Sequence, residues 1–130
     1  MRILLDSTVL IDYLRDRPVA ANRVDALADS LDQPCTTAIN IEEIVRGLRS
    51  DEMDRAQLLF EGLEILPLGN EEAWRAGTWR RGFAGQGVTL PQADCLVAAA
   101  AFMSASKLAT GNPRHFPMTE IEVEHWPVGE

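Results

Sequence analysis

Three carboxylates stand where a short chain could assemble a metal site. Asp6 follows a short apolar run, Glu43 lies in a segment with helical periodicity, and Asp94 opens a long apolar segment. Carboxylates that converge repel one another, and their pKa values rise unless a cation neutralises them. Mg²⁺ and Mn²⁺ are hard cations that prefer such oxygen ligands. A site of this kind activates water and stabilises the charge that develops during hydrolysis of a phosphate ester.

Each of these acids also has a purely structural interpretation. Asp6 could cap the helix that the sequence predicts from Val9. Glu43 lies three residues after Asn40, the expected N-cap of the next helix, and this is the spacing of a capping box. Asp94 opens a helix that should be buried, where a carboxylate must be paired, hydrogen-bonded or bound to a metal. The nearby basic residues and a divalent ion are both possible partners for it.

Strands alternate with helices along the chain without hairpin signals, which predicts a parallel sheet covered by helices on both faces. Ligands of such sheets bind beyond the carboxyl ends of the strands. Asp6 ends the first strand, and Gly111 and Asn112 follow a later one. Asn70 is the expected cap of the fifth helix, and Pro91 is expected in the first turn of the sixth. The predicted strands are 2–5, 35–38, 64–68, 107–110 and 121–123, and the predicted helices are 9–15, 19–31, 41–49, 51–62, 70–83 and 91–103.

Length and composition predict a single domain over residues 1–130, because 130 residues with 46% hydrophobic content suit one core. The longest apolar run, Cys95 to Met103, is too short to span a membrane, and the amino terminus lacks a signal-peptide pattern, so we expect a cytoplasmic protein. Cys35 and Cys95 have no metal-type spacing and are expected to be buried, reduced thiols.

The charge distribution separates one basic segment from an acidic whole. The net charge of −8 argues against a generic nucleic-acid binder. Between Ala73 and Thr119, however, five basic residues accompany a single acid, Asp94, which leaves that segment with a net charge of +4. The acid excess elsewhere suits a basic protein partner. The candidates for contact with RNA phosphates are Arg80, Arg81 and Arg114.

Four segments, in order, resemble the PIN-domain family, and within it the VapC toxins of toxin–antitoxin pairs. The segment LLDSTVLIDYL resembles the first strand and first acid, and LATGNPRHF resembles the closing block, with Asn112 at its fourth acidic position. In TTAINIEEIVRGL, the glutamate four residues before a glycine is Glu43, not Glu42. RRGFAGQGVTLPQADCLVAAAAF resembles the third block, with Asp94 as its acid. The resemblance covers essentially the whole chain.

This resemblance implies a PIN-like three-layer α/β/α fold with a central parallel sheet of four to five strands. It also implies an endoribonuclease that depends on Mg²⁺ (or Mn²⁺). Asp6 and Asp94 would be the principal metal ligands, and Glu43 a ligand through water or an acid that orients water. Thr8 and Thr110 are expected to support the site.

Asn112 is the residue at which the chain departs from an all-acid pattern. Its amide oxygen can coordinate a cation but adds no charge, which weakens a second metal most. The structural alternative is that Asn112 only caps the turn before Pro113.

The implied partners are a small VapB-like antitoxin and a structured cellular RNA such as tRNA or rRNA. The implied assembly is a homodimer or a toxin–antitoxin hetero-oligomer, with no membrane association.

Three other functions compete with this interpretation. A haloacid-dehalogenase-type phosphatase would need its second aspartate where Thr8 stands, and a cap domain for which the chain has no room. A response-regulator receiver needs paired acids after the first strand and a phospho-acceptor aspartate near Ala38, and both are missing. A degenerate PIN module kept only for protein binding is disfavoured by the three intact acids.

Overall fold

The computed structural model describes all 130 residues and contains one sheet of five strands in the order β3-β2-β1-β4-β5. All four neighbouring pairs are parallel. The first strand is therefore central, and its Leu4 and Leu5 are fully buried. This agrees with the predicted parallel sheet. The strands are β1 (Arg2–Leu5), β2 (Gln33–Thr37), β3 (Glu64–Leu66), β4 (Lys107–Thr110) and β5 (Glu122–His125).

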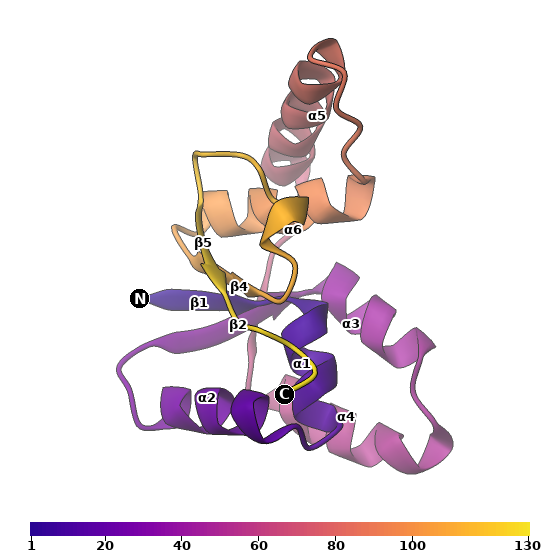
Figure 1. The fold of residues 1–130 in the computed structure, drawn as a ribbon, viewed down its shortest axis with the longest axis vertical. Helices are drawn as coiled ribbons and strands as arrows, with labels where there is room; N and C mark the ends of the chain where they lie inside the picture. The colour runs from indigo at the N-terminus through magenta and orange to yellow at the C-terminus, as the bar shows by residue number, and fades with distance from the viewer.

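Helices cover both faces of the sheet, and α5 and α6 lie on the face opposite to α1, α2 and α4 (Figure 1). Successive residues of a strand point to opposite faces. Leu4 accordingly packs into a hydrophobic cluster with α5 and α6, whereas Ile3 and Leu5 pack with α1, α3 and α4. The three-layer α/β/α prediction is confirmed. The helices are α1 (Ser7–Leu14), α2 (Pro18–Ala28), α3 (Ala38–Arg46), α4 (Met53–Glu61), α5 (Asn70–Gly85) and α6 (Gln92–Met103), with 3₁₀ turns η1 (Ser50–Glu52) and η2 (Pro113–His115).

The start of α3 differs from the sequence prediction. The N-cap is Thr37, whose hydroxyl accepts a hydrogen bond from the amide of Asn40 at 3.4 Å. Asn40 is therefore inside the first turn, and the predicted N-cap role for it is wrong. The capping box pairs Thr37 with Asn40, so the predicted capping box of Asn40 with Glu43 is wrong as well. Threonine is itself a good cap, and it ends the strand one residue before the predicted boundary.

The bounds of α5 and α6 also differ from the sequence prediction. Gly69, not Asn70, precedes α5, and its amide donates to the Glu72 carboxylate at 2.8 Å. The same helix continues past Phe83 to Gly85, because Trp79 and Phe83 pack against α6 and extend the buried contact. Pro91 has an extended backbone and lies just before α6, not in its first turn. None of the helices combines the length and the hydropathy that crossing a membrane requires.

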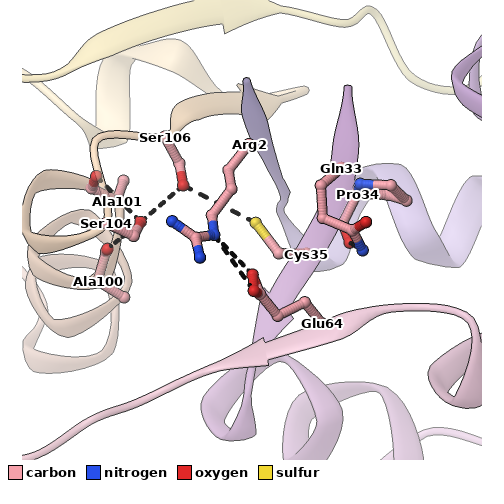
Figure 2. Close-up of polar contacts among 9 residues, drawn as sticks. All are labelled: Arg2, Gln33, Pro34, Cys35, Glu64, Ala100, Ala101, Ser104 and Ser106. Carbon is pink, nitrogen blue, oxygen red and sulfur yellow. Dashed lines mark hydrogen bonds and ion pairs between the residues drawn. The ribbon is translucent and has the colours of Figure 1, made fainter. Parts of the chain in front are cut away.

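The amino ends of the strands carry a compact set of satisfied polar contacts (Figure 2). The guanidinium of Arg2 donates to the Glu64 carboxylate at 2.6 Å, and the hydroxyls of Ser104 and Ser106 lie 2.6 Å apart. Burial raises the pKa of the Cys35 thiol to about 11, so this thiol is neutral at pH 7. Cys95 is also free and buried, which confirms the prediction of two buried, reduced thiols.

Candidate active site at the carboxyl edge of the sheet

Asp6 occupies the junction between the central strand and α1. Its amide donates to the carbonyl of Ala109 at 3.0 Å, which continues the pairing of β1 with β4. Asp6 stands at the N-cap position with an extended backbone, but its carboxylate makes no capping hydrogen bond. Helix capping therefore does not explain the position of this carboxylate, which is available to bind a ligand.

Neutral donors from three elements hold the Asp6 carboxylate. Oδ2 accepts hydrogen bonds from the hydroxyls of Thr110 (2.7 Å) and Thr8 (3.3 Å), and Oδ1 accepts one from the side-chain amide of Asn40 (3.3 Å). Asp6 is only 9% exposed and has no ion pair with a basic side chain. Its orientation is fixed, while its negative charge is not neutralised. Thr8 and Thr110 lie where the sequence placed supporting residues.

Asn40 belongs to the site, and its role there was not predicted from the sequence. It is fully buried, and its Oδ1 accepts a hydrogen bond of 2.7 Å from the Thr37 hydroxyl. Its Nδ2 donates both to Asp6 and to the hydroxyl of Ser7 (3.0 Å), which in turn donates to the Glu43 carboxylate (2.9 Å). The sequence feature that could have indicated this role is the Thr-x-x-Asn spacing at a strand end, because this spacing is also typical of an N-cap threonine followed by a polar residue in the first turn of the helix.

The structure distinguishes between the two adjacent glutamates of α3. Glu43 turns toward Ser7 and lines the edge where the strands end. Glu42 instead forms an exposed ion pair with Arg46 at 2.6 Å, and that hydrogen bond lowers the pKa of Glu42. Only Glu43 is therefore placed to act with Asp6.

Asp94 lies in the first turn of α6, with 22% of its side chain exposed. Burial raises the pKa of Asp94, and the charges of Asp6 and Glu43 raise it further. The opposing contribution comes from His115, whose Nδ1 lies 3.4 Å from Oδ2 of Asp94. The basic partner is thus a histidine of the η2 turn, and not one of the lysines or arginines near it in sequence. The charges of Asp6 and Glu43 therefore act on Asp94.

Asn112 follows β4 and precedes η2. Its backbone amide donates to the Thr110 hydroxyl at 3.0 Å, whereas its side chain is exposed and makes no capping hydrogen bond. The alternative role as a turn cap is therefore not seen. The preceding Gly111 donates from its amide to Thr8 at 3.0 Å, and a Cβ there would meet Cγ1 of Val128 at 2.5 Å. The carboxyl-terminal segment thus needs glycine at this position to pack against the site loop.

The donor chemistry of this edge suits a hard divalent cation, although no group of three or more His, Cys, Asp or Glu side chains is already arranged around one metal position. Asp6 and Asp94 offer carboxylate oxygens from different elements, and neither carboxylate forms an ion pair with a lysine or an arginine. Asp6 and Asp94 would bind the ion directly, with Glu43 reaching it through water.

Two of the three arginines expected at RNA, Arg80 and Arg114, lie next to elements of this site. Arg80 of α5 donates to the carbonyl of Leu90 at 3.0 Å, just before the helix that carries Asp94. Arg114 is exposed in the η2 turn, two residues after Asn112. Arg81 is exposed on another face of α5. None of the three arginines forms an ion pair with a carboxylate.

Comparison with known proteins agrees with this fold. The family model described as "PIN domain" matches residues 3–120. Ribonuclease VapC10 of Mycobacterium tuberculosis is 33% identical over 119 residues, which cover 91% of this chain and 88% of that protein. Ribonuclease VapC19 of the same organism is 27% identical over 115 residues, or 88% and 92% of the two chains.

A solved structure shows the same fold. The crystal structure of VapBC2 from Rickettsia felis, bound to a DNA fragment from its promoter, matches with a TM-score of 0.85 over 97% of this chain and 99% of that chain, at 18% sequence identity. The chain therefore belongs to the PIN-domain family. Within that family it is VapC-like, because the two ribonucleases that it resembles along most of their length are both VapC proteins.

Replacement of Asn40 by alanine is expected to destabilise the protein by about 1–3 kcal/mol, because Thr37 and Asp6 then lose a buried hydrogen-bond partner. Urea unfolding measures this change. The control is Asn22→Ala at an exposed position of α2, which should change the free energy of unfolding by less than about 0.5 kcal/mol. Equal stabilities of the two variants would show that the Asn40 contacts contribute nothing.

Replacement of Asp94 by asparagine is expected to stabilise the metal-free protein at pH 7. The folded-state pKa of Asp94 is raised above 3.8, so its ionisation costs the folded state free energy at any pH above that raised value. The gain should shrink as the pH falls toward 3.8, where the carboxyl is protonated in both states. Urea unfolding with a chelator present, at pH 7 and pH 5, tests this. A variant less stable than the parent at pH 7 contradicts it.

Proposed function

We propose that this protein is an Mg²⁺- or Mn²⁺-dependent endoribonuclease that acts as the toxin of a toxin–antitoxin pair. The observation that carries the proposal is the position of Asp6, Glu43 and Asp94 at one edge of the sheet, where burial raises the pKa of Asp94 and the charges of Asp6 and Glu43 raise it further. The family assignment supports the same chemistry, since the similar VapC10 and VapC19 proteins are named ribonucleases.

The chain supplies positioning and proton transfer around the reacting phosphodiester. A bound divalent ion lowers the pKa of water and offsets the negative charge of the phosphate. Thr110, Thr8 and Asn40 hold the Asp6 carboxylate in one orientation. Glu43, fixed by the Ser7 hydroxyl, is the general base that accepts the proton of the attacking water.

Basic side chains of α5 and η2 would offset the acidic character of the chain toward RNA. Arg80, Arg81 and Arg114 have no carboxylate partners, so their charges are available to phosphates. The substrate class that we propose is a structured cellular RNA such as tRNA or rRNA.

Cleavage of purified tRNA and rRNA with and without Mg²⁺ tests the activity. Asp6→Asn and Asp94→Asn should each lower the cleavage rate by at least about 100-fold, because even indirect support of a metal is worth up to that factor. Asp25→Asn, at an exposed position of α2, is the matched control and should cleave like the parent.

In the same assay Asn112→Asp should lower the Mg²⁺ concentration needed for cleavage, since it adds a negative charge to the pocket.

Full cleavage by Asp94→Asn would remove Asp94 from the mechanism. Hydrolysis of a small phosphate ester without RNA cleavage would favour a phosphatase, and loss of all hydrolysis with retained partner binding would favour a degenerate PIN module.

A VapB-like antitoxin is the proposed partner, alone or bound to a homodimer of this chain. A groove of about 630 Å³ between α2 and α4 is lined by Val24, Leu27 and Leu59, and Leu58 and Leu31 at its edge are 69% and 101% exposed. Exposed apolar surface of this kind marks a protein interface. Asp25 and Asp32, which also line the groove, suit basic residues on an amphipathic segment of the antitoxin.

Co-expression with the product of the adjacent reading frame tests the partner. We expect a stable complex that Leu58→Glu weakens by at least about tenfold, since the substitution buries a charge in an apolar contact. The control is Ile65→Glu, which also replaces an exposed apolar side chain but lies outside the groove. A complex unaffected by Leu58→Glu would place the partner elsewhere.

A further inference from the structure

A second groove opens beside Glu43, between α1, α3 and η1. Its volume is about 420 Å³, and Glu43 forms part of its wall. The groove therefore shares Glu43 with the candidate active site. Its apolar lining consists of Ile11, Leu14, Ile44 and Leu48.

Two arginines line this groove without partners of their own. Arg15 follows the last residue of α1, and Arg49 precedes η1; both are exposed. Neither guanidinium donates a hydrogen bond or forms an ion pair. In contrast, Arg46 and Arg55 in the neighbouring helices are each paired with a carboxylate at 2.6 Å.

The acids of the groove do not neutralise these two guanidiniums. The carboxylate of Glu52 accepts a hydrogen bond from the backbone amide of Arg49 at 2.9 Å, and so it caps the 3₁₀ turn. The carboxylate of Glu43 accepts from Ser7 and faces the site. The groove thus combines two free cations with an apolar floor, and a catalytic acid stands at one end.

We propose that Arg15 and Arg49 form a phosphate-binding subsite for the RNA strand on the Glu43 side of the cleaved bond. This inference rests on the proposed ribonuclease function. A guanidinium binds a phosphate through two parallel hydrogen bonds, which fixes the position of the backbone as well as attracting it. The apolar floor would accept a ribose or a base. The presence of Glu43 in the wall of the groove favours the substrate strand over an acidic segment of a protein partner.

Binding of a fluorescent single-stranded RNA, measured by anisotropy against salt concentration, tests the subsite. All proteins carry Asp94→Asn, so that the RNA stays intact. The double variant Arg15→Ala/Arg49→Ala should bind on the order of tenfold more weakly at low salt. It should also reduce the slope of log Kd against log salt by about 1.4, which corresponds to two lost phosphate contacts on a single strand.

The matched control removes the same charge outside the groove, through Arg17→Ala/Arg46→Ala, and should leave the slope unchanged. The pair Arg15→Lys/Arg49→Lys retains the charge and should keep most of the slope while it weakens affinity, because lysine lacks the paired donors. Urea unfolding confirms that each variant is folded.

An unchanged slope for the Arg15/Arg49 alanine pair, in a protein whose parent binds RNA, overturns the subsite and leaves the proposed function standing. Unchanged RNA binding together with weaker antitoxin binding would assign the groove to the protein partner and also overturn the proposal. If the parent protein neither cleaves RNA nor binds it, the proposed function fails and the subsite fails with it.

Discussion

The unneutralised carboxylate of Asp6, at the end of the central strand, is the constraint on which the rest of the site depends. An ionised group that is 9% exposed needs partners, and three hydrogen-bond donors from α1, α3 and β4 supply them without cancelling its charge. The hydroxyl of Thr110 and the amide of Asn40 can reach Asp6 only if β1, β2 and β4 are adjacent and parallel. The sheet order and the site therefore support each other.

The charged side chains at the two edges of the sheet have different kinds of partner. At the amino edge, Arg2 pairs with Glu64, and Lys107 lies 3.8 Å from both Glu122 and Glu124. At the carboxyl edge the acids meet only neutral donors and the single histidine next to Asp94. Burial raises the pKa of Asp94, the charges of Asp6 and Glu43 raise it further, and this rise is a free-energy cost to the folded state. Costs of this kind persist at functional sites, where a ligand offsets them.

Much of this arrangement could be predicted from local sequence. The apolar runs at 2–5 and 107–110 became β1 and β4 with the expected bounds, and the acid that ends the first run lies at the expected edge. Asn40 and His115 could not be assigned in the same way. The role of Asn40 depends on Thr37, and not Asn40, being the N-cap of α3. The role of His115 depends on the η2 turn folding back toward α6, which is a tertiary contact between residues 21 positions apart.

Anomalous diffraction from crystals soaked in Mn²⁺ would locate the bound ion independently of activity. We expect a manganese peak between the carboxylates of Asp6 and Asp94, with Glu43 on its water shell, and no such peak in crystals of Asp94→Asn. A peak elsewhere on the molecule, with none at the carboxyl edge of the sheet, would show that these carboxylates do not form the metal site.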